Sequence, residues 1–553
     1  MHYNILIGGA AGQGVDTTAS VLVKLLKSEG YAVFTNSDFM SRIRGGHNFI
    51  LIRFGDSLVY SHSLVLDGLI ALDDDTVSLH LEELKNDGFI LCDEKIKTDD
   101  KRAIKVPLAT MAKDLGNPRV SGSIANSVIL KLFSLTLDNV ESVLSQELAE
   151  KYLDINIEAF TKGYDLVESR YPKLQADFSG HMLINGNKAL ALGALASGLK
   201  FYSAYPMSPS TSIMEFLAEQ GKDLNVVVEQ AEDEIAAINM AIGASFTGVR
   251  AMTGTSGGGF SLMVEALGLS GIAEIPLVAV DVQRPGPATG LPTRTEQSDL
   301  RFVIHASQGE FPRKVIAIRH HEDAYRQTIK AFDTADKYQT AVIILSDQFL
   351  GDGLATIKPL TLPDKTTVVK PEIKGEYKSY QLTEDGISPR LFPGLTEHLV
   401  NADSDEHDEQ GLITESADVR NKMMEKRMRK LQGIINELEE PDFFGCDNAQ
   451  VLLVGWGSTW GPIKEAIELL NRKPPGKYSA LVFGDVYPLP EKLLTKHAKT
   501  AKVIINVEQN ATGQLAGLIR EKTGIVCTDH ILKYDGRQIT GEEIVKSVME
   551  VNV

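Results

Sequence analysis

Cysteine is scarce in this 553-residue chain: Cys92, Cys446 and Cys527 are the only three, and no two lie close in sequence. This scarcity excludes a disulfide framework. It also argues against an iron–sulfur cluster held by this chain alone, because a four-iron cluster takes four thiolates, usually closely spaced. Scattered single thiols are typical of a reducing compartment, so we expect a cytoplasmic protein.

Long apolar runs and net positive charge are also missing. No apolar stretch reaches the roughly 18 residues expected of a membrane span. No Lys or Arg precedes Lys24, whereas a signal peptide would begin with basic residues. The formal net charge of −18 should repel nucleic acid and anionic membranes. We therefore expect neither of them as a partner.

What the chain does contain is a repeated alternation of short apolar strands and amphipathic helices. This alternation predicts an α/β protein with three doubly wound, mainly parallel domains at residues 1–178, 179–355 and 446–553. The intervening segment, 356–445, holds proline-rich pieces, an acidic stretch and a Met- and Lys-rich helix expected at 419–438. We expect it to be a connector lying on the surface.

A glycine-rich turn follows the first predicted strand. Its run from Gly8 to Gly14 contains no strict G-x-G-x-x-G, so a dinucleotide site is only weakly indicated. There are two alternatives: a turn that binds no ligand, and a loop that binds another phosphorylated group. Nearby, Arg42 and Arg44 precede a glycine pair, which suits an anion site as well as a solvated loop.

Residues 205–211 form a turn after a predicted strand, stiffened by two prolines. Its hydroxyl groups lie at the carboxyl end of the strand, where α/β proteins bind ligands. An equal alternative is a helix cap, in which Ser210 or Thr211 begins the next helix.

Four acidic residues lie between positions 229 and 234, at the start of a predicted helix. Such a cluster usually complements the positive end of the helix dipole. Glu234 differs because apolar residues 235–238 follow it directly, which places it at the edge of a buried helix. A carboxyl withdrawn from water can donate or share a proton, so Glu234 is a candidate functional acid.

Two further loops complete the second domain. Residues 253–259 are small, flexible and rich in hydroxyl groups, as a loop lining a ligand would be. Residues 283–294 form a longer loop that is stiffened by prolines and carries Arg284 and Arg294. Loops of this length in compact domains are usually functional.

Taken together, these motifs resemble the α subunit of 2-oxoacid:ferredoxin oxidoreductases, in the form whose γ domain is fused at the N-terminus. The turn at 205–210 resembles the family's Tyr-Pro-Ile-Thr-Pro-Ser motif, with Met207 and Ser208 in place of Ile and Thr. Residues 230–237, 253–259 and 286–293 match as well, the Gly-Gln-Gly-Val and Arg-Gly-Gly segments resemble the γ part, and residues 406–411 and 427–430 resemble the 2-oxoglutarate branch.

The resemblance implies a thiamine diphosphate enzyme that decarboxylates a 2-oxoacid, with 2-oxoglutarate favoured. It would form succinyl-CoA and CO2 with CoA and pass electrons through an iron–sulfur cluster to ferredoxin. The reaction is reversible, which would suit the reductive TCA cycle. Pyruvate or a broad range of 2-oxoacids is an alternative substrate, and a Rossmann-type NAD(P) oxidoreductase or a non-catalytic scaffold subunit is an alternative function.

The resemblance also implies roles for individual residues. Glu234 matches the family glutamate that hydrogen-bonds N1′ of the aminopyrimidine and favours its imino tautomer, whose nitrogen can take the thiazolium C2 proton. Ser208 matches a threonine that contacts the substrate, and Arg284, then Arg294, would clamp the substrate carboxylate. Further candidates are Thr289 and Thr293 for the substrate, Tyr205, Pro206, Thr255 and Ser256 for the coenzyme, and Gly12, Gly14, Arg42 and Arg44 for CoA.

Residues 351–353 read Gly-Asp-Gly, which opens the diphosphate and magnesium motif of thiamine enzymes. That motif needs a later Asn as a second ligand to magnesium, and none occurs between residues 354 and 400. The resemblance therefore places the diphosphate site, Mg²⁺ and the [4Fe-4S] cluster on a separate β subunit and no metal site on this chain. It implies an (αβ)2 heterotetramer, and this chain alone should be inactive.

Overall fold

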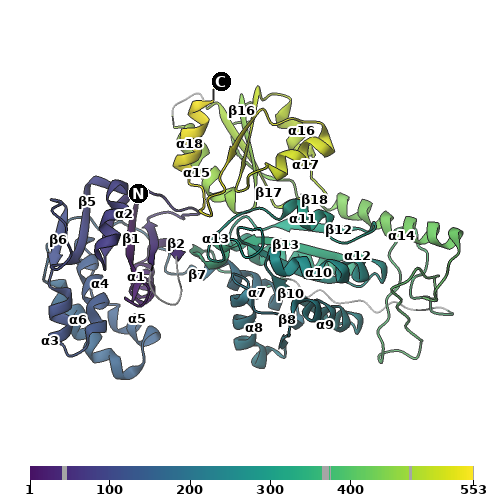
Figure 1. Cartoon of the computed structure of the whole chain (residues 1–553), viewed down its shortest axis with the longest axis horizontal. Helices are drawn as coiled ribbons and strands as arrows, with labels where there is room; N and C mark the ends of the chain where they lie inside the picture. The colour runs from purple at the N-terminus through teal and green to yellow at the C-terminus, as the bar shows by residue number, and fades with distance from the viewer. Residues whose placement is uncertain (40–45, 364–372, 374, 473–475, 552–553) are drawn as a thin grey trace. The chain divides into compact units, whose positions relative to one another are not determined.

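The computed structural model describes residues 1–39, 46–363, 373, 375–472 and 476–551. The chain forms two compact units (Figure 1). The first comprises Met1–Ile184 together with Asp352–Pro359, and the second comprises Asn185–Gly351 and Leu360–Val553. No helix in the described ranges is both long enough and apolar enough to cross a membrane.

The first unit is built on an eight-stranded sheet with the order β6-β5-β4-β1-β3-β2-β14-β7. Its strands are β1 (His2–Ala10), β2 (Ala32–Phe39), β3 (His47–Gly55), β4 (Leu66–Ala71), β5 (Leu84–Asp93), β6 (Ala103–Val106), β7 (Met182–Asn185) and β14 (Leu354–Ile357). Its α-helices are α1 (Val15–Ser28), α2 (Asp74–His80), α3 (Leu108–Asp114), α4 (Ser121–Leu132), α5 (Val140–Glu147) and α6 (Leu153–Tyr164).

Strand β1 lies at the centre of this sheet and is buried on both faces. Ile5 and Ile7 join the core formed with α1, α4 and α6, whereas Leu6 points into the opposite core. This alternation follows from the two-residue period of a strand. The α/β class is confirmed, but the expectation of a mainly parallel sheet is wrong here. Strands β4, β5 and β6 continue the sheet in parallel, whereas β3 pairs antiparallel with both β1 and β2.

The second unit contains a seven-stranded sheet with the order β18-β12-β13-β11-β10-β8-β9. Neighbouring strands of this sheet run parallel to each other, except that β18 pairs antiparallel with β12. Its strands are β8 (Leu199–Ala204), β9 (Val227–Gln230), β10 (Arg250–Thr255), β11 (Leu277–Gln283), β12 (Arg313–Ala317), β13 (Ala341–Asp347) and β18 (Asp485–Tyr487). The helices are α7 (Gly186–Ala196), α8 (Thr211–Leu224), α9 (Glu234–Phe246), α10 (Gly257–Ile272), α11 (Leu300–His305), α12 (His321–Tyr338) and α13 (Gln348–Asp352).

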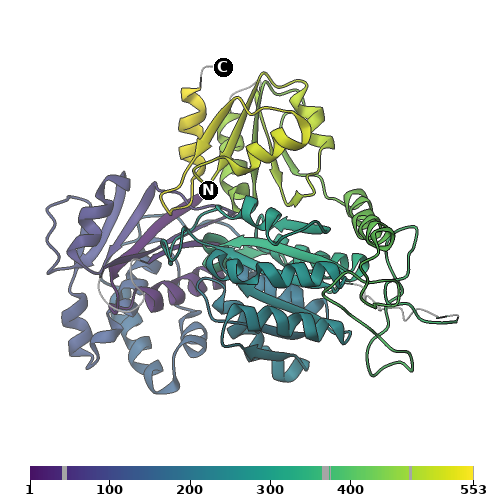
Figure 2. The same cartoon turned by 45° about the vertical axis from the view of Figure 1, so that its right-hand side comes forward.

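Helices pack on the seven-stranded sheet from both sides, as its strand burial requires (Figure 2). Alternate residues of β11, Leu277 and Ala279, belong to the core formed with α9 and α10. Every residue of this strand is buried, which is typical of a parallel strand covered on both faces. The sheet therefore presents its ligand-binding edge at the carboxyl ends of its strands.

A smaller five-stranded sheet, with the order β15-β17-β16-β19-β20, completes the second unit. Figure 1 shows α15 and α18 on one side of it and α16 and α17 on the other. The elements are β15 (Asp442–Gly445), β16 (Val451–Trp456), β17 (Tyr478–Phe483), β19 (Val503–Glu508), β20 (Asp529–Leu532), α15 (Trp460–Leu470), α16 (Lys492–Ala498), α17 (Gln514–Thr523) and α18 (Gly541–Glu550).

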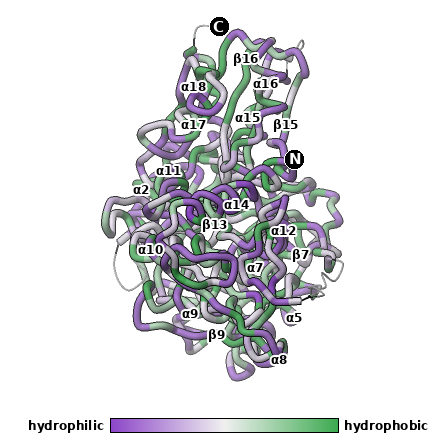
Figure 3. The backbone as a smooth tube through the Cα atoms, turned by 90° about the vertical axis from the view of Figure 1, so that its right-hand side faces the viewer, coloured by the Kyte–Doolittle hydropathy of each residue, from purple (hydrophilic) through white to green (hydrophobic). Residues whose placement is uncertain are grey.

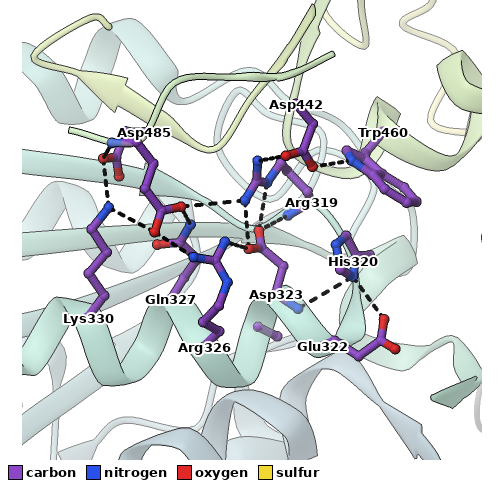
Figure 4. A network of polar contacts seen from close by, with 12 residues as sticks. Arg319, His320, Glu322, Asp323, Arg326, Gln327, Lys330, Asp442, Trp460 and Asp485 are labelled. Carbon is purple, nitrogen blue, oxygen red and sulfur yellow. Dashed lines mark hydrogen bonds and ion pairs between the residues drawn. The ribbon is translucent and has the colours of Figure 1, made fainter. Parts of the chain in front are cut away.

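A network of ion pairs around α12 connects the seven-stranded sheet with β15 of the smaller sheet (Figure 4). Arg319, beside α12, contacts Asp323 at 2.9 Å and Asp442 of β15 at 3.0 Å. Lys330 of α12 contacts Asp485 of β18 at 3.0 Å. Strand β18 itself leaves the smaller sheet and pairs with β12. The smaller sheet is therefore anchored by both main-chain and side-chain contacts.

Helix α14 (Ala417–Asn436) confirms the helix expected in the connector, and Figure 3 shows it as mostly hydrophilic. The connector is also anchored in the interior, because Lys426 and Lys430 of α14 are buried and paired with the buried carboxylate of Glu274. Burial lowers the pKa of Lys430 to about 8. The sequence suggested a solvated face because each buried cation has its partner more than 150 positions away.

Candidate functional site

Three loops of the second unit meet at the carboxyl ends of β8, β10 and β11, which are neighbours in the sheet. Arg284 Nη1 donates a hydrogen bond of 2.7 Å to the main-chain oxygen of Ser208. Thr255 Oγ1 lies 3.8 Å from the Met207 sulfur. The structure thus brings together the predicted residues of the turns at 205–211, 253–259 and 283–294.

Glu234 begins α9 at the same edge of the sheet and is only 3% exposed. Its neighbour Asp233 caps the helix by accepting a 2.8 Å hydrogen bond from the Ala236 N–H. Glu234 Oε1, in contrast, has no hydrogen-bond partner within the described ranges. Since buried polar atoms are nearly always satisfied, an unsatisfied carboxyl oxygen at a sheet edge indicates a binding site.

The start of α10 comes very close to Glu234 because residue 259 is glycine. A Cβ atom at Gly259 would lie 2.5 Å from Glu234 Oε1 and would collide with Thr255 Oγ1. Any larger residue would push the carboxyl group away from the turn at 253–259. The glycines of this turn therefore allow the hydroxyl groups and the acid to approach each other.

Other buried polar atoms near the end of β10 also lack partners in the described part of the chain: Tyr202 Oη, Thr253 Oγ1, Ser256 Oγ, both oxygens of Asp281, and Asp299 Oδ2. Sequence reasoning missed the two aspartates, because neither of them lies in one of the loops that it singled out. A signal was present, since Asp281 interrupts the apolar strand β11. A charged residue inside a buried strand needs either a partner or a function.

The remaining predicted residues differ in exposure. Thr255 and Ser256 are fully buried, whereas Ser208 and Thr289 are exposed and Tyr205 is 41% exposed. Pro206, Arg284, Thr293 and Arg294 are half-buried, and burial lowers the pKa of Arg284. Arg294 also lies against Gly536, which follows β20 of the smaller sheet. Arg284, in contrast, is hydrogen-bonded to the turn at 205–211.

Ser210 occupies the position before α8, as the alternative of a helix cap predicted, but its hydroxyl does not cap the helix. It donates instead to the main-chain oxygen of Met207 at 2.8 Å. The hydroxyl thus stabilises the turn that carries Met207 and Ser208. The Gly-Asp-Gly sequence falls at the end of α13, where the chain passes from the second unit to the first.

In the first unit, the glycine-rich turn opens onto a cavity of about 800 Å³. Gly12 and Gly14 line this cavity. Their φ angles are +94° and +85°, which residues with a Cβ atom rarely adopt. Arg119 lines the same cavity. The predicted anion ligands Arg42 and Arg44 lie outside the described residues.

Two family descriptions match the chain. "Pyruvate flavodoxin/ferredoxin oxidoreductase, thiamine diP-bdg" matches residues 192–426, which include the site at the carboxyl ends of β8, β10 and β11. "Pyruvate ferredoxin/flavodoxin oxidoreductase" matches residues 4–166, which include the glycine-rich turn.

Relatives match over all or most of the chain. The 2-oxoacid:ferredoxin oxidoreductase subunit alpha of Sulfolobus sp. is 33% identical, with 100% of this chain and 97% of the relative covered. The 2-oxoglutarate oxidoreductase subunit KorA of Mycobacterium tuberculosis is 32% identical over 77% of this chain and 67% of its own length. A solved structure, 2-oxoglutarate:ferredoxin oxidoreductase from Magnetococcus marinus with 2-oxoglutarate, coenzyme A and succinyl-CoA bound, matches with a TM-score of 0.93 and 31% identity over 99% of both chains.

Proposed function

This chain belongs to the α subunits of the 2-oxoacid:ferredoxin oxidoreductases, and from that premise we propose that it serves a thiamine diphosphate-dependent enzyme whose main substrate is 2-oxoglutarate. With CoA, the products would be succinyl-CoA, CO2 and reduced ferredoxin. The observation that carries the proposal is Glu234, a buried carboxyl with an unsatisfied oxygen at the carboxyl edge of the parallel sheet.

The residues of the site fit the aminopyrimidine ring of the coenzyme. Glu234 Oε1 and Ser256 Oγ are buried polar atoms without a hydrogen-bond partner in the described ranges. The nitrogen atoms of a polar heteroaromatic ring would provide such partners. When bound, the coenzyme supplies the electron sink that decarboxylation of a 2-oxoacid requires. Glu234 would hold a proton at N1′ of the ring, and the turn at 253–259 would fix the ring beside it.

Arg284 would orient the substrate through its carboxylate. Its hydrogen bond to Ser208 fixes the guanidinium at the turn that carries the Ser208 hydroxyl. A guanidinium has five N–H donors, so several remain to bind a carboxylate. Thr289, Thr293 and Arg294 belong to the same loop and would complete the substrate pocket.

A β subunit would cover the site and hold the diphosphate, Mg²⁺ and the [4Fe-4S] cluster. The support is an apolar face formed by Ile235 and Met240 of α9 and Leu262 of α10, which are 50%, 37% and 50% exposed. Ile235 follows Glu234 directly in the chain, and clustered exposed apolar side chains mark interfaces with other proteins. The resulting assembly would be an (αβ)2 heterotetramer in the reducing cytoplasm, where three unpaired cysteines are stable.

CoA would bind at the cavity of the first unit. A volume of about 800 Å³ lies within the usual range of ligand pockets, roughly 300–1,000 Å³. Main-chain N–H groups of the glycine-rich turn at the start of α1 suit phosphate oxygens. Gly12, Gly14 and Arg119 would contact the nucleotide, and Arg42 and Arg44 remain proposed ligands.

The test is a substrate panel on the chain co-purified with its β subunit. We expect reduction of a low-potential dye that requires CoA and is fastest with 2-oxoglutarate, slower with pyruvate, and absent with this chain alone. Titration with NADH serves as a second measurement. Tight NADH binding without any 2-oxoacid-dependent reduction would overturn the proposal and favour an NAD(P) oxidoreductase.

A further inference from the structure

The loop at 283–294, the substrate loop, has an exposed tip and continues into a buried arm, residues 295–299. The tip residues 286–292 are exposed, whereas Gln297 of the arm is fully buried. An exposed tip gains little from packing of its own. The position of its proposed substrate-binding side chains, such as Thr293, therefore depends on how firmly the arm is held.

Gln297 is bonded to the smaller sheet through both its main chain and its side chain. Its main-chain N–H donates to the main-chain oxygen of Gln509 at 2.7 Å, and its main-chain oxygen accepts from Asn510 Nδ2 at 3.1 Å. Its side-chain Nε2 donates to the main-chain oxygen of Trp456 at 2.8 Å, and Oε1 accepts from the Gln509 N–H at 3.2 Å. Trp456 ends β16, and Gln509 and Asn510 follow β19. One buried residue thus joins the arm to two strands of the smaller sheet.

These contacts lie where a doubly wound sheet normally binds its ligand. Strands β16 and β19 are parallel neighbours, and β17, the next strand after β16 in the smaller sheet, lies on the other side of β16. The carboxyl ends of two strands at such a reversal of strand order form the usual ligand site of an α/β sheet. The side-chain amide of Gln297 bridges the ends of β16 and β19. A residue that follows the substrate loop therefore occupies this position.

The neighbours of Gln297 in the arm are held in the same way. The Thr295 N–H donates to the main-chain oxygen of Gly536 at 3.2 Å. Gln514 Nε2 donates to the main-chain oxygen of Ser298 at 2.6 Å. Gly536 follows β20, and Gln514 begins α17. Contacts with the elements of the smaller sheet therefore extend along the arm on both sides of Gln297.

We propose that the smaller sheet is an internal receptor for Gln297 and thereby holds the substrate loop in the geometry that binds the substrate. Gln297 is a positioning residue that acts through Thr293, four positions earlier in the chain. Small displacements of a loop that orients a substrate strongly reduce catalysis, even when the substituted residue is remote from the reacting atoms. The inference rests on the proposed function only for the identity of the substrate.

The test variant is Gln297→Met, which keeps the length of the side chain but removes its hydrogen bonds to Trp456 and Gln509. The matched control is Asn471→Leu, which also replaces an amide that bridges main-chain groups. Asn471 Nδ2 donates to the Tyr478 oxygen at 2.9 Å, and Oδ1 accepts from the Tyr478 N–H at 3.3 Å. Tyr478 begins β17, so the control lies at the opposite end of the smaller sheet.

The first measurement is hydrogen–deuterium exchange of the main-chain N–H groups of residues 295–299 in the full chain, which needs neither coenzyme nor activity. We expect these groups to exchange at least about tenfold faster in Gln297→Met than in the wild type, because the arm opens more often. Asn471→Leu should leave them unchanged. Unchanged exchange in Gln297→Met would overturn the proposal. Equal acceleration in both variants would overturn it as well, since the arm would then follow the stability of the whole sheet.

The second measurement is the KM for 2-oxoglutarate of the assembled αβ complex, with and without the substitution Thr293→Ala. We expect Gln297→Met to raise KM about tenfold with a smaller change in kcat, and to raise it little further in the Thr293→Ala background. Independent effects of the two substitutions would refute the positioning role. If the wild-type complex reduces the dye with none of the 2-oxoacids, the proposed function fails instead, while the exchange data still decide whether Gln297 holds the arm.

If Gln297→Met does not fold, Gln514→Met provides the alternative. It removes the hydrogen bond to Ser298 and leaves the side chain of Gln297 in place. The main-chain N–H groups of residues 295–299 should again exchange faster, and KM for 2-oxoglutarate should rise about threefold. Wild-type exchange together with a wild-type KM in Gln514→Met would contradict the proposal.

Discussion

Two buried polar regions of the second unit differ in whether their charged side chains are paired. Around α12, Asp323 is contacted by Arg319 and Arg326, and Lys330 pairs with Asp485 (Figure 4). Around the end of β10, in contrast, Glu234, Asp281 and Asp299 are buried acids without a cation within hydrogen-bonding distance in the described ranges. Paired charges stabilise the junction of the two sheets, whereas the unpaired acids lie where a ligand is expected.

The largest effect should come from breaking the paired region. Replacing Asp323 by Ala removes the shared partner of two arginines, and we expect the free energy of unfolding to fall by about 3–5 kcal/mol. Chemical denaturation measures it, with Asp223→Ala as the exposed control. Turnover of complexes that remain folded should be nearly unchanged, since Asp323 makes none of the contacts of the site.

The Asp323 carboxyl should also make the stability of the chain depend on pH. Burial alone would raise the pKa of Asp323, but Arg319 and Arg326 outweigh burial and hold it well below its usual range. Its contribution to stability is therefore present above the ordinary pKa of Asp, about 3.9, and is lost as the pH falls further. A weaker loss of stability below pH 4 in Asp323→Ala than in the wild type would confirm the sign.

In the unpaired region we expect the opposite result, a large change in turnover and a small change in stability. Replacing Glu234 by Gln keeps the shape but removes the acid, and we expect turnover of the assembled enzyme to fall at least about a hundredfold. The melting temperature should change little, because no hydrogen bond to Glu234 Oε1 is lost within the described ranges. Glu232→Gln, exposed and two positions away, is the control. Near-normal turnover of Glu234→Gln would refute the assigned role.

A smaller effect separates the two arginines of the substrate loop. Arg284→Lys keeps the charge but loses bidentate binding, so KM for the 2-oxoacid should rise about tenfold with a smaller change in kcat. Arg294→Lys should change KM less, because Arg294 packs against Gly536. Steady-state kinetics on both variants would show the reverse order if Arg294 binds the carboxylate.

The smallest effect tests whether pairing or burial makes the α12 network important. Lys162 and Glu158 also form an ion pair, at 2.8 Å, but their side chains are 51% and 54% exposed. Glu158→Gln should change the free energy of unfolding by less than about 0.5 kcal/mol. A loss comparable to that of Asp323→Ala would show that burial does not explain why the α12 network is stabilising.

Local features of this chain were predictable from its sequence, whereas distant pairings were not. The glycine-rich turn, the helix of the connector and the position of Glu234 before an apolar run follow from residues that are neighbours in the chain. Other contacts join residues that are far apart in the chain. Strand β2 pairs with β14, and Lys426 is buried against Glu274, 152 positions away. No periodicity encodes such contacts.

Strand β14 gives the first unit an unusual dependence on the rest of the chain. Its residues come after β13 of the second unit in sequence, yet the main-chain N–H of Val33 donates to the Thr356 hydroxyl at 2.9 Å. A fragment ending at residue 184 would lack that strand and leave the edge of β2 open to aggregation. Expression of the two units as separate genes would therefore require the segment Asp352–Pro359 to be grafted onto the first, by a linker or a circular permutation.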